Sequence, residues 1–202
     1  MLVWRSELYC TAFNKQQLPP QSACEIVFLG RSNVGKSTLI NSLLGRRIAK
    51  VSSHPGKTRS INFYKVETGE KNFSLVDIPG FGYAARGLDE RKSWWKLIES
   101  YFDSRRNIPF VIHLIDFRHG PLANDIELIH WLDSIQMPRL VVFTKGDKIS
   151  SGRKKGLYSQ YLNDGLDSLL PPFITSGVND KEMDALRSGI IETIKEMAKL
   201  EA

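Results

Sequence analysis

Two glycines, a lysine and a serine stand at fixed offsets in FLGRSNVGKSTLI, residues 28–40. The pattern G-x-x-x-x-G-K-[ST], between an apolar run and a helical stretch, is typical of a loop that surrounds phosphate groups with backbone N–H groups. Gly30 and Gly35 let the backbone curl, and the N-terminus of the following helix adds its positive dipole end. We expect Lys36 to reach the β and γ phosphates of a nucleotide and Ser37 to bind Mg²⁺. A glycine-rich turn without a ligand has the same local pattern, so further motifs must decide.

A second motif, VDIPGFGYA, places Asp77 at the end of an apolar run and Gly80 three residues later. A carboxylate at such a strand end can hold Mg²⁺ through water, and the Gly80 N–H can contact a γ-phosphate. Phe81 follows Gly80 directly, and its phenyl ring cannot hold an attacking water by hydrogen bonding. Arg59 and Arg86 are candidates for a catalytic arginine. We therefore expect intrinsic hydrolysis on the order of 10⁻³ s⁻¹ or slower, which a partner could accelerate.

The motif TKGDK, residues 144–148, indicates which base is bound. The Asp147 carboxylate can accept two hydrogen bonds, from N1–H and the exocyclic amino group of guanine, whereas adenine offers an acceptor at N1. The stem of Lys145 can lie over the purine, and the backbone N–H of Ser176 could meet the guanine O6. The three motifs in this order predict GTP and GDP as ligands.

Length and composition set the broad class of the chain. It has 202 residues, 42% of them hydrophobic, which suits one domain with one substantial core rather than a disordered or disulfide-rich chain. Cys10 and Cys24 form no metal-ligand pattern, and the N-terminus resembles neither a signal peptide nor a transit peptide, so we expect a soluble, cytoplasmic protein without a membrane span. The net charge of +6 favours polyanionic partners, although a mildly basic solvated surface has the same composition.

Alternating apolar runs and amphipathic stretches predict the elements that position these motifs. The strands are expected at residues 25–30, 61–66, 72–78, 110–116, 139–144 and 173–177, and the helices at about 36–44, 89–103, 123–134, 152–163 and 180–200. Residues 61–66 and 72–78 predict a hairpin, and the remaining strands follow helices. This order predicts an α/β fold, a mostly parallel sheet with one antiparallel strand and helices on both faces. Residues 1–22 are expected to form an arm that packs on a single domain, 23–200.

The segments LPP…EIVFLGRSNVGKSTLIN, PGKTRSINFY, DIPGFGYA, LIDFRHGP…D and TKGDK resemble the EngB (YihA/YsxC) family, from about Phe13 to Ala198. These are small ribosome-assembly GTPases of the Ras-like, translation-factor class of P-loop GTPases. The resemblance implies a three-layer fold with a six-stranded sheet, GTP and Mg²⁺ binding, and GTP hydrolysis. It also implies a role in maturing the large ribosomal subunit and a requirement in cell division and septation.

The resemblance implies nucleotide contacts for the residues that match the family's motifs. Gly30, Arg31, Ser32, Asn33, Val34, Gly35, Lys36 and Ser37 match the phosphate loop, and Thr38 continues it into the helix. Gly56, Lys57, Thr58, Arg59 and Ser60 match the first switch, and Asp77, Ile78, Pro79 and Gly80 match the anchor of the second. Thr144, Lys145, Gly146, Asp147, Thr175, Ser176 and Gly177 match the guanine contacts. Thr144 stands where asparagine is usual in the wider class, and a hydroxyl makes fewer tethering hydrogen bonds.

Four of these residues are expected to act at the γ-phosphate: Lys36, Thr58, Gly80 and Asn33. The resemblance makes Thr58 a second Mg²⁺ ligand beside Ser37, with Asp77 as the third member of the metal site. Asn33 could bind K⁺, whose charge would replace an arginine finger, or it could satisfy a local backbone group.

The leading hypothesis is a monomeric GTP-hydrolysing switch that acts on a precursor of the large ribosomal subunit. The alternative is a nucleotide-gated rRNA or protein binding module with incidental hydrolysis, and a P-loop kinase would have no use for TKGDK. Basic clusters would bind rRNA if they gather on one face, and each taken singly could be a solvated helix end. The clusters are Arg46–Arg47–Lys50, Arg91–Lys92, Arg105–Arg106 and Arg153–Lys154–Lys155.

Overall fold

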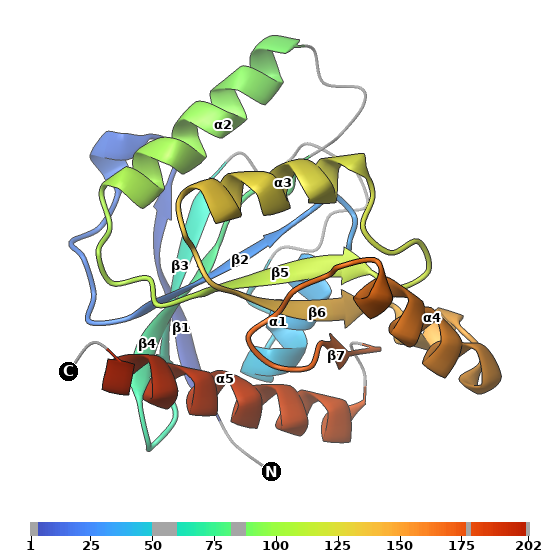
Figure 1. Ribbon diagram of the computed structural model, residues 1–202. Helices are drawn as coiled ribbons and strands as arrows, with labels where there is room; N and C mark the ends of the chain where they lie inside the picture. Colours follow the sequence, from blue (N-terminus) through green and yellow to red (C-terminus); the bar gives the residue numbers. More distant parts are fainter. Residues whose placement is uncertain (1–3, 50–59, 82–87, 177–178, 201–202) are drawn as a thin grey trace.

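A computed structural model of the protein describes residues 4–49, 60–81, 88–176 and 179–200 (Figure 1). Its strands are β1 (Arg5–Ala12), β2 (Glu25–Gly30), β3 (Ile61–Glu67), β4 (Asn72–Asp77), β5 (Val111–Asp116), β6 (Arg139–Thr144) and β7 (Phe173–Ile174). Its helices are α1 (Lys36–Leu44), α2 (Leu88–Asp103), α3 (Ala123–Ser134), α4 (Ser151–Asn163) and α5 (Asp180–Leu200). Two short 3₁₀ turns are η1 (Lys15–Gln17) and η2 (Gly146–Lys148).

The seven strands form one sheet in the order β1-β3-β4-β2-β5-β6-β7. Strand β3 runs antiparallel to both of its neighbours, and all other strands share one direction. The predicted mixed sheet with one antiparallel strand is therefore confirmed, but the predicted number of six strands is wrong. The seventh is β1, which lies within the residues expected to form an arm and pairs with β3 from Arg5 opposite Glu67 to Ala12 opposite Ile61.

Helices cover both faces of the sheet, as predicted (Figure 1). On one face α1 and α5 pack against alternate residues of the strands, through side chains such as Leu39 and Ile190. On the other face α2 and α3 pack against the intervening residues, through side chains such as Ile98 and Leu128. Helix α4 packs against β5 and β6 on that second face, where its Tyr161 side chain is buried. Strands β2 and β5 are buried on both sides, which explains why their sequences are continuous apolar runs.

Element boundaries agree with the predictions within one residue at most ends, and β7 is the main exception. It spans Phe173–Ile174 rather than 173–177. The N–H of Ser176 donates to the carboxylate of Glu182 at 2.7 Å, so the segment turns away from the sheet ladder there. Among the described residues, no helix combines the length and the apolar character that crossing a bilayer requires.

Candidate nucleotide site

The phosphate loop joins the end of β2 to the start of α1. Gly35 precedes the helix with φ of 108°, a left-handed conformation that glycine adopts without strain. Asn33 is also left-handed, with φ of 64°, which asparagine tolerates better than most residues. Val34 between them is 2% exposed and packs into the core with α1. The buried Val34 side chain therefore anchors the loop backbone to the core, while Asn33 is exposed.

The segment that contains Gly80 and Phe81 lies directly against this loop. The N–H of Ser32 donates to the Phe81 carbonyl at 2.9 Å, and the Phe81 N–H donates to the Gly30 carbonyl at 3.3 Å. The Ser32 hydroxyl donates to the Gly80 carbonyl at 3.1 Å. A Cβ atom on Gly80 would lie 2.9 Å from the Cα and N atoms of Ser32, so this contact requires glycine. The fold thus brings together the two motifs predicted to meet a γ-phosphate.

Lys36 and Asp77 form a buried ion pair between these two motifs. The Lys36 ammonium donates to Oδ1 of Asp77, and the two residues are 8% and 3% exposed. Lys36 is the first residue of α1 and Asp77 is the last residue of β4. The pair places the predicted phosphate ligand and the predicted metal ligand together. The ammonium, the helix N-terminus and the loop N–H groups make this a place suited to anions.

Phe81 packs into the core beneath α2. Its side chain is 7% exposed, and its ring centroid lies 5.5 Å from that of Trp94. The indole N–H of Trp94 donates to the Pro79 carbonyl at 2.7 Å. Trp95 is half-buried, and its ring contacts the Trp94 ring edge-on at 5.0 Å. Phe81 and Trp94 therefore anchor both sides of Gly80.

The TKGDK segment reaches the phosphate loop from β6. The Thr144 hydroxyl donates to the Val34 carbonyl at 2.6 Å, and the Lys145 ammonium donates to the Asn33 carbonyl at 2.6 Å. Threonine in place of asparagine therefore still supplies one tether to the loop. The Asp147 side chain is 38% exposed and forms an ion pair with Lys148 at 2.9 Å. The hydrogen bond from Lys148 lowers the pKa of Asp147 below its usual value.

Thr175 and Ser176, two of the predicted guanine contacts, lie beside the TKGDK segment. The Gly146 N–H donates to the Thr175 carbonyl at 2.9 Å, and a Cβ atom on Gly146 would lie 2.5 Å from Ile174 Cγ2. Both the N–H and the hydroxyl of Ser176 donate to the Glu182 carboxylate at 2.7 Å. The predicted donor to guanine O6 therefore already has an acidic partner, which the sequence reasoning did not anticipate.

Some of the predicted residues lie outside the part of the chain that the structure describes. These are Gly56, Lys57, Thr58 and Arg59 of the first switch, together with Arg86 and Gly177. Ser60 is described, and it is buried just before β3.

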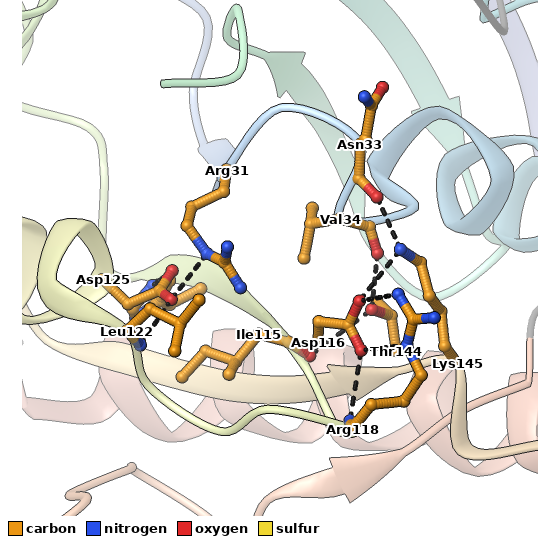
Figure 2. Close-up of polar contacts among 11 residues, drawn as sticks. Arg31, Asn33, Val34, Ile115, Asp116, Arg118, Leu122, Asp125, Thr144 and Lys145 are labelled. Carbon is orange, nitrogen blue, oxygen red and sulfur yellow. Dashed lines mark hydrogen bonds and ion pairs between the residues drawn. The ribbon is translucent and has the colours of Figure 1, made fainter. Parts of the chain in front are cut away.

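Three residues with contacts at the site were given no role by the sequence reasoning: Asp116, Arg118 and Asp125. Figure 2 shows Asp116 between Arg118 and Lys145, and Asp125 facing Arg31 of the phosphate loop. Burial by itself would raise the pKa of Asp116, but hydrogen bonds from Arg118 and Lys145 outweigh it and hold the pKa well below its usual value. All three belong to the segment LIDFRHGP…D, whose acids at the end of an apolar strand were the available signal.

The comparisons with known proteins agree with this geometry. Residues 25–145 match the family described as 50S ribosome-binding GTPase. A probable GTP-binding protein EngB of Kosmotoga olearia is 44% identical over 161 residues, 80% of this chain and 83% of the relative. The Clostridium perfringens protein of the same description is 40% identical over 200 residues, 97% of this chain and 99% of the relative. A crystal structure of a probable EngB protein, 25% identical, covers 86% of this chain and 99% of its own with a TM-score of 0.63. The chain therefore belongs to the EngB family, and it is a P-loop GTPase that binds and hydrolyses GTP.

Proposed function

We propose that the chain is a slow GTPase switch that acts in assembly of the large ribosomal subunit. The observation that carries the ribosomal part is the match of residues 25–145 to the 50S ribosome-binding GTPase family. The switching part is supported by the hydrogen bonds that join Ser32 to Gly80 and Phe81. Any movement of the phosphate loop relative to Gly80 must disturb these hydrogen bonds. Loss of the γ-phosphate would therefore change the position of the second switch directly.

The nucleotide site in this proposal consists of the residues predicted from the motifs. The phosphates lie on residues 30–38 and Gly80, and the guanine base lies between residues 144–147 and 175–177. We assign residues 56–60, the first switch, to the γ-phosphate. The Asp147 carboxylate, which its lowered pKa keeps charged at neutral pH, selects guanine.

Mg²⁺ fits the chemistry of the proposed metal site. The hard oxygens of the Ser37 hydroxyl and the Asp77 carboxylate are of the type that Mg²⁺ prefers, and we assign Thr58 as the third ligand. Bound Mg²⁺ would neutralise charge on the β and γ phosphates. Asp77 is already paired with the ammonium of Lys36, so a metal and a phosphate would each take over one member of an existing ion pair.

We expect hydrolysis to be slow because Phe81 cannot orient water. The ring is buried in the core against Trp94, and in no rotamer does it have a polar group that could bind water. A monovalent cation at Asn33 is the candidate replacement for an arginine finger. The side-chain amide of Asn33 points away from Lys145 in Figure 2, whereas the backbone carbonyl of Asn33 accepts a hydrogen bond from that lysine. Equal hydrolysis rates in KCl and NaCl at matched ionic strength would discard K⁺.

The decisive experiment is cosedimentation of the protein with large ribosomal subunits and their precursors, across a salt series. The proposal expects binding with a non-hydrolysable GTP analogue, release with GDP, and weakening with salt if rRNA phosphates are contacted. Equal binding with the GTP analogue and with GDP would refute the switch. Stable nucleotide-dependent binding that persists in GTP, without turnover even with K⁺ and ribosomal particles, would instead favour a gated binding module, the alternative that Phe81 keeps open.

We propose that the role in cell division is a consequence of ribosome assembly. This proposal predicts a definite order of defects when the protein is lost. Depletion of the protein in cells should cause precursors of the large subunit to accumulate before septation fails. Failure of septation first would contradict that order. We also propose a monomer, which sedimentation equilibrium with GDP and with a GTP analogue would test.

A further inference from the structure

The segment that follows β5 supports the phosphate loop at two points: Asp125 contacts Arg31 directly, and Asp116 reaches the Asn33 carbonyl through Lys145. It begins at Asp116, the last residue of β5, and ends at Asp125 in the first turn of α3. In Figure 2 the loop lies between them, with Arg31 directed toward Asp125 and the Asn33 and Val34 carbonyls directed toward Lys145 and Thr144. The GTPase motifs assign no role to this segment.

Asp125 holds the first half of the loop. Its Oδ2 atom lies 2.7 Å from Nε of Arg31, and the two side chains are 0% and 18% exposed. The same oxygen accepts the Leu122 N–H at 3.0 Å, so the carboxylate is fixed by the start of its own helix. Oδ1 lies 3.6 Å from Nε2 of the buried His113 on β5. A fully buried carboxylate is costly unless it is paired, so Arg31 is strongly constrained to this position.

Asp116 holds the second half of the loop through Lys145. The carboxylate accepts Nε and Nη2 of Arg118 at 2.9 and 2.7 Å, and it accepts the Lys145 ammonium at 2.9 Å. That ammonium also donates to the Asn33 carbonyl at 2.6 Å. Asp116 is 4% exposed, and its pair of cations keeps it ionised. It therefore fixes the position from which Lys145 grips the loop.

This arrangement answers a need of any loop that binds phosphate through N–H groups. When successive N–H groups point inward, the carbonyls at the same peptides point outward and need partners of their own. The outward carbonyl of Asn33 has Lys145 as its donor. Without Asp116, that ammonium could turn toward water, and the loop would have to be ordered again on each binding event.

We propose that Asp116 and Asp125 are positioning residues that preorganise the phosphate loop, Asp116 through Lys145 and Asp125 through Arg31. The inference rests on the proposed placement of the phosphates on residues 30–38. It makes the segment 116–125 a support of the nucleotide site that neither touches the ligand nor selects the base.

The test is titration calorimetry of GDP with Asp116→Ala and Asp125→Asn. The asparagine keeps an acceptor for the Leu122 N–H, which limits damage to α3. Each variant should bind GDP about tenfold more weakly, the scale of one lost contact between charged groups, with the stoichiometry unchanged. The ratio of GDP to IDP affinity should stay as in the wild type, because Asp147 is untouched. Asp133→Ala is the matched control: this acid also lies on α3 and pairs with Arg139, and its GDP affinity should not change.

Double-mutant cycles separate positioning from general damage. Asp116→Ala should add nothing to Lys145→Met, and Asp125→Asn should add nothing to Arg31→Met. If Asp125→Asn fails to fold, Arg31→Met removes the other member of the same ion pair. That single variant must then lower the affinity for GDP.

Three results would overturn the inference: wild-type affinity in the single variants, additive effects in the cycles, or loss of stoichiometry without a change in affinity. A wild-type protein that binds no GDP would instead refute the proposed nucleotide site.

Discussion

The hydroxyl of Thr144 should contribute measurably to stability, because it bonds the buried end of β6 to the phosphate loop. The side chain is 4% exposed and lies 2.6 Å from the Val34 carbonyl. Thr144→Val keeps the shape but removes the donor, which leaves a buried acceptor without this partner. Such a loss costs about 1–3 kcal/mol, and the short distance favours the middle of that range, about 2 kcal/mol. For a chain of this size that corresponds to a fall of roughly 4–8 °C in Tm.

Urea denaturation and GDP calorimetry measure the two effects of this change. We expect the unfolding free energy to fall as stated and GDP affinity to fall by up to about tenfold, because the loop loses one tether. Thr193→Val is the matched control, since that buried hydroxyl donates to the Gly189 carbonyl at 2.8 Å within α5. It should leave GDP affinity unchanged. Wild-type stability and affinity in Thr144→Val would refute the tether, and equal loss of affinity in both variants would refute its location.

Two further predictions concern a loop glycine and Asp147, the acid that we propose binds the base. Gly120→Ala should lower the unfolding free energy in urea by about 1–3 kcal/mol, because Gly120 has φ of +66° and its Cβ would lie 2.4 Å from Tyr161 Cε1. Gly152→Ala, in α4 with open space around it, should raise stability by about 0.5–1 kcal/mol, and the opposite order would contradict the geometry. The lowered pKa of Asp147 keeps its carboxylate charged as the pH falls, so calorimetry should find the preference for GDP over ADP intact from pH 7 down to about 4. A preference lost near pH 6 would assign selectivity to another group.

The fold was predictable where the sequence has regular periodicity. Helices 36–44, 123–134 and 180–200 begin and end as predicted, because apolar spacing and local breaks define them. Strand β1 was not predictable in this way. Its buried positions include the small residues Ser6 and Ala12, whereas Leu8 is 46% exposed. Pairing with β3, rather than an apolar alternation, decides its structure, and that partner lies far along the chain.

The candidate site was predictable to the extent that each motif is local. Spacing alone identified the phosphate loop, the aspartate of β4 and the TKGDK segment, and the structure brings these together. The roles of Asp116 and Asp125 depend on partners that are distant in sequence, with Lys145 standing 29 positions after Asp116. A single sequence shows that such acids are present but not which cation each one meets.

The contacts of the phosphate loop differ in how readily they could respond to a nucleotide. The Arg31–Asp125 ion pair and the Thr144–Val34 hydrogen bond are largely buried, so breaking either would leave an unpaired polar group in the core. The Ser32–Gly80 hydrogen bond is only part-buried, and water can replace it at lower cost. We therefore expect the loop to stay fixed while the Gly80 side moves. Because Trp94 donates to the Pro79 carbonyl and packs on Phe81, larger movements of the Gly80 side must also displace α2. In the proposed switch, that helix would transmit the nucleotide state to a partner.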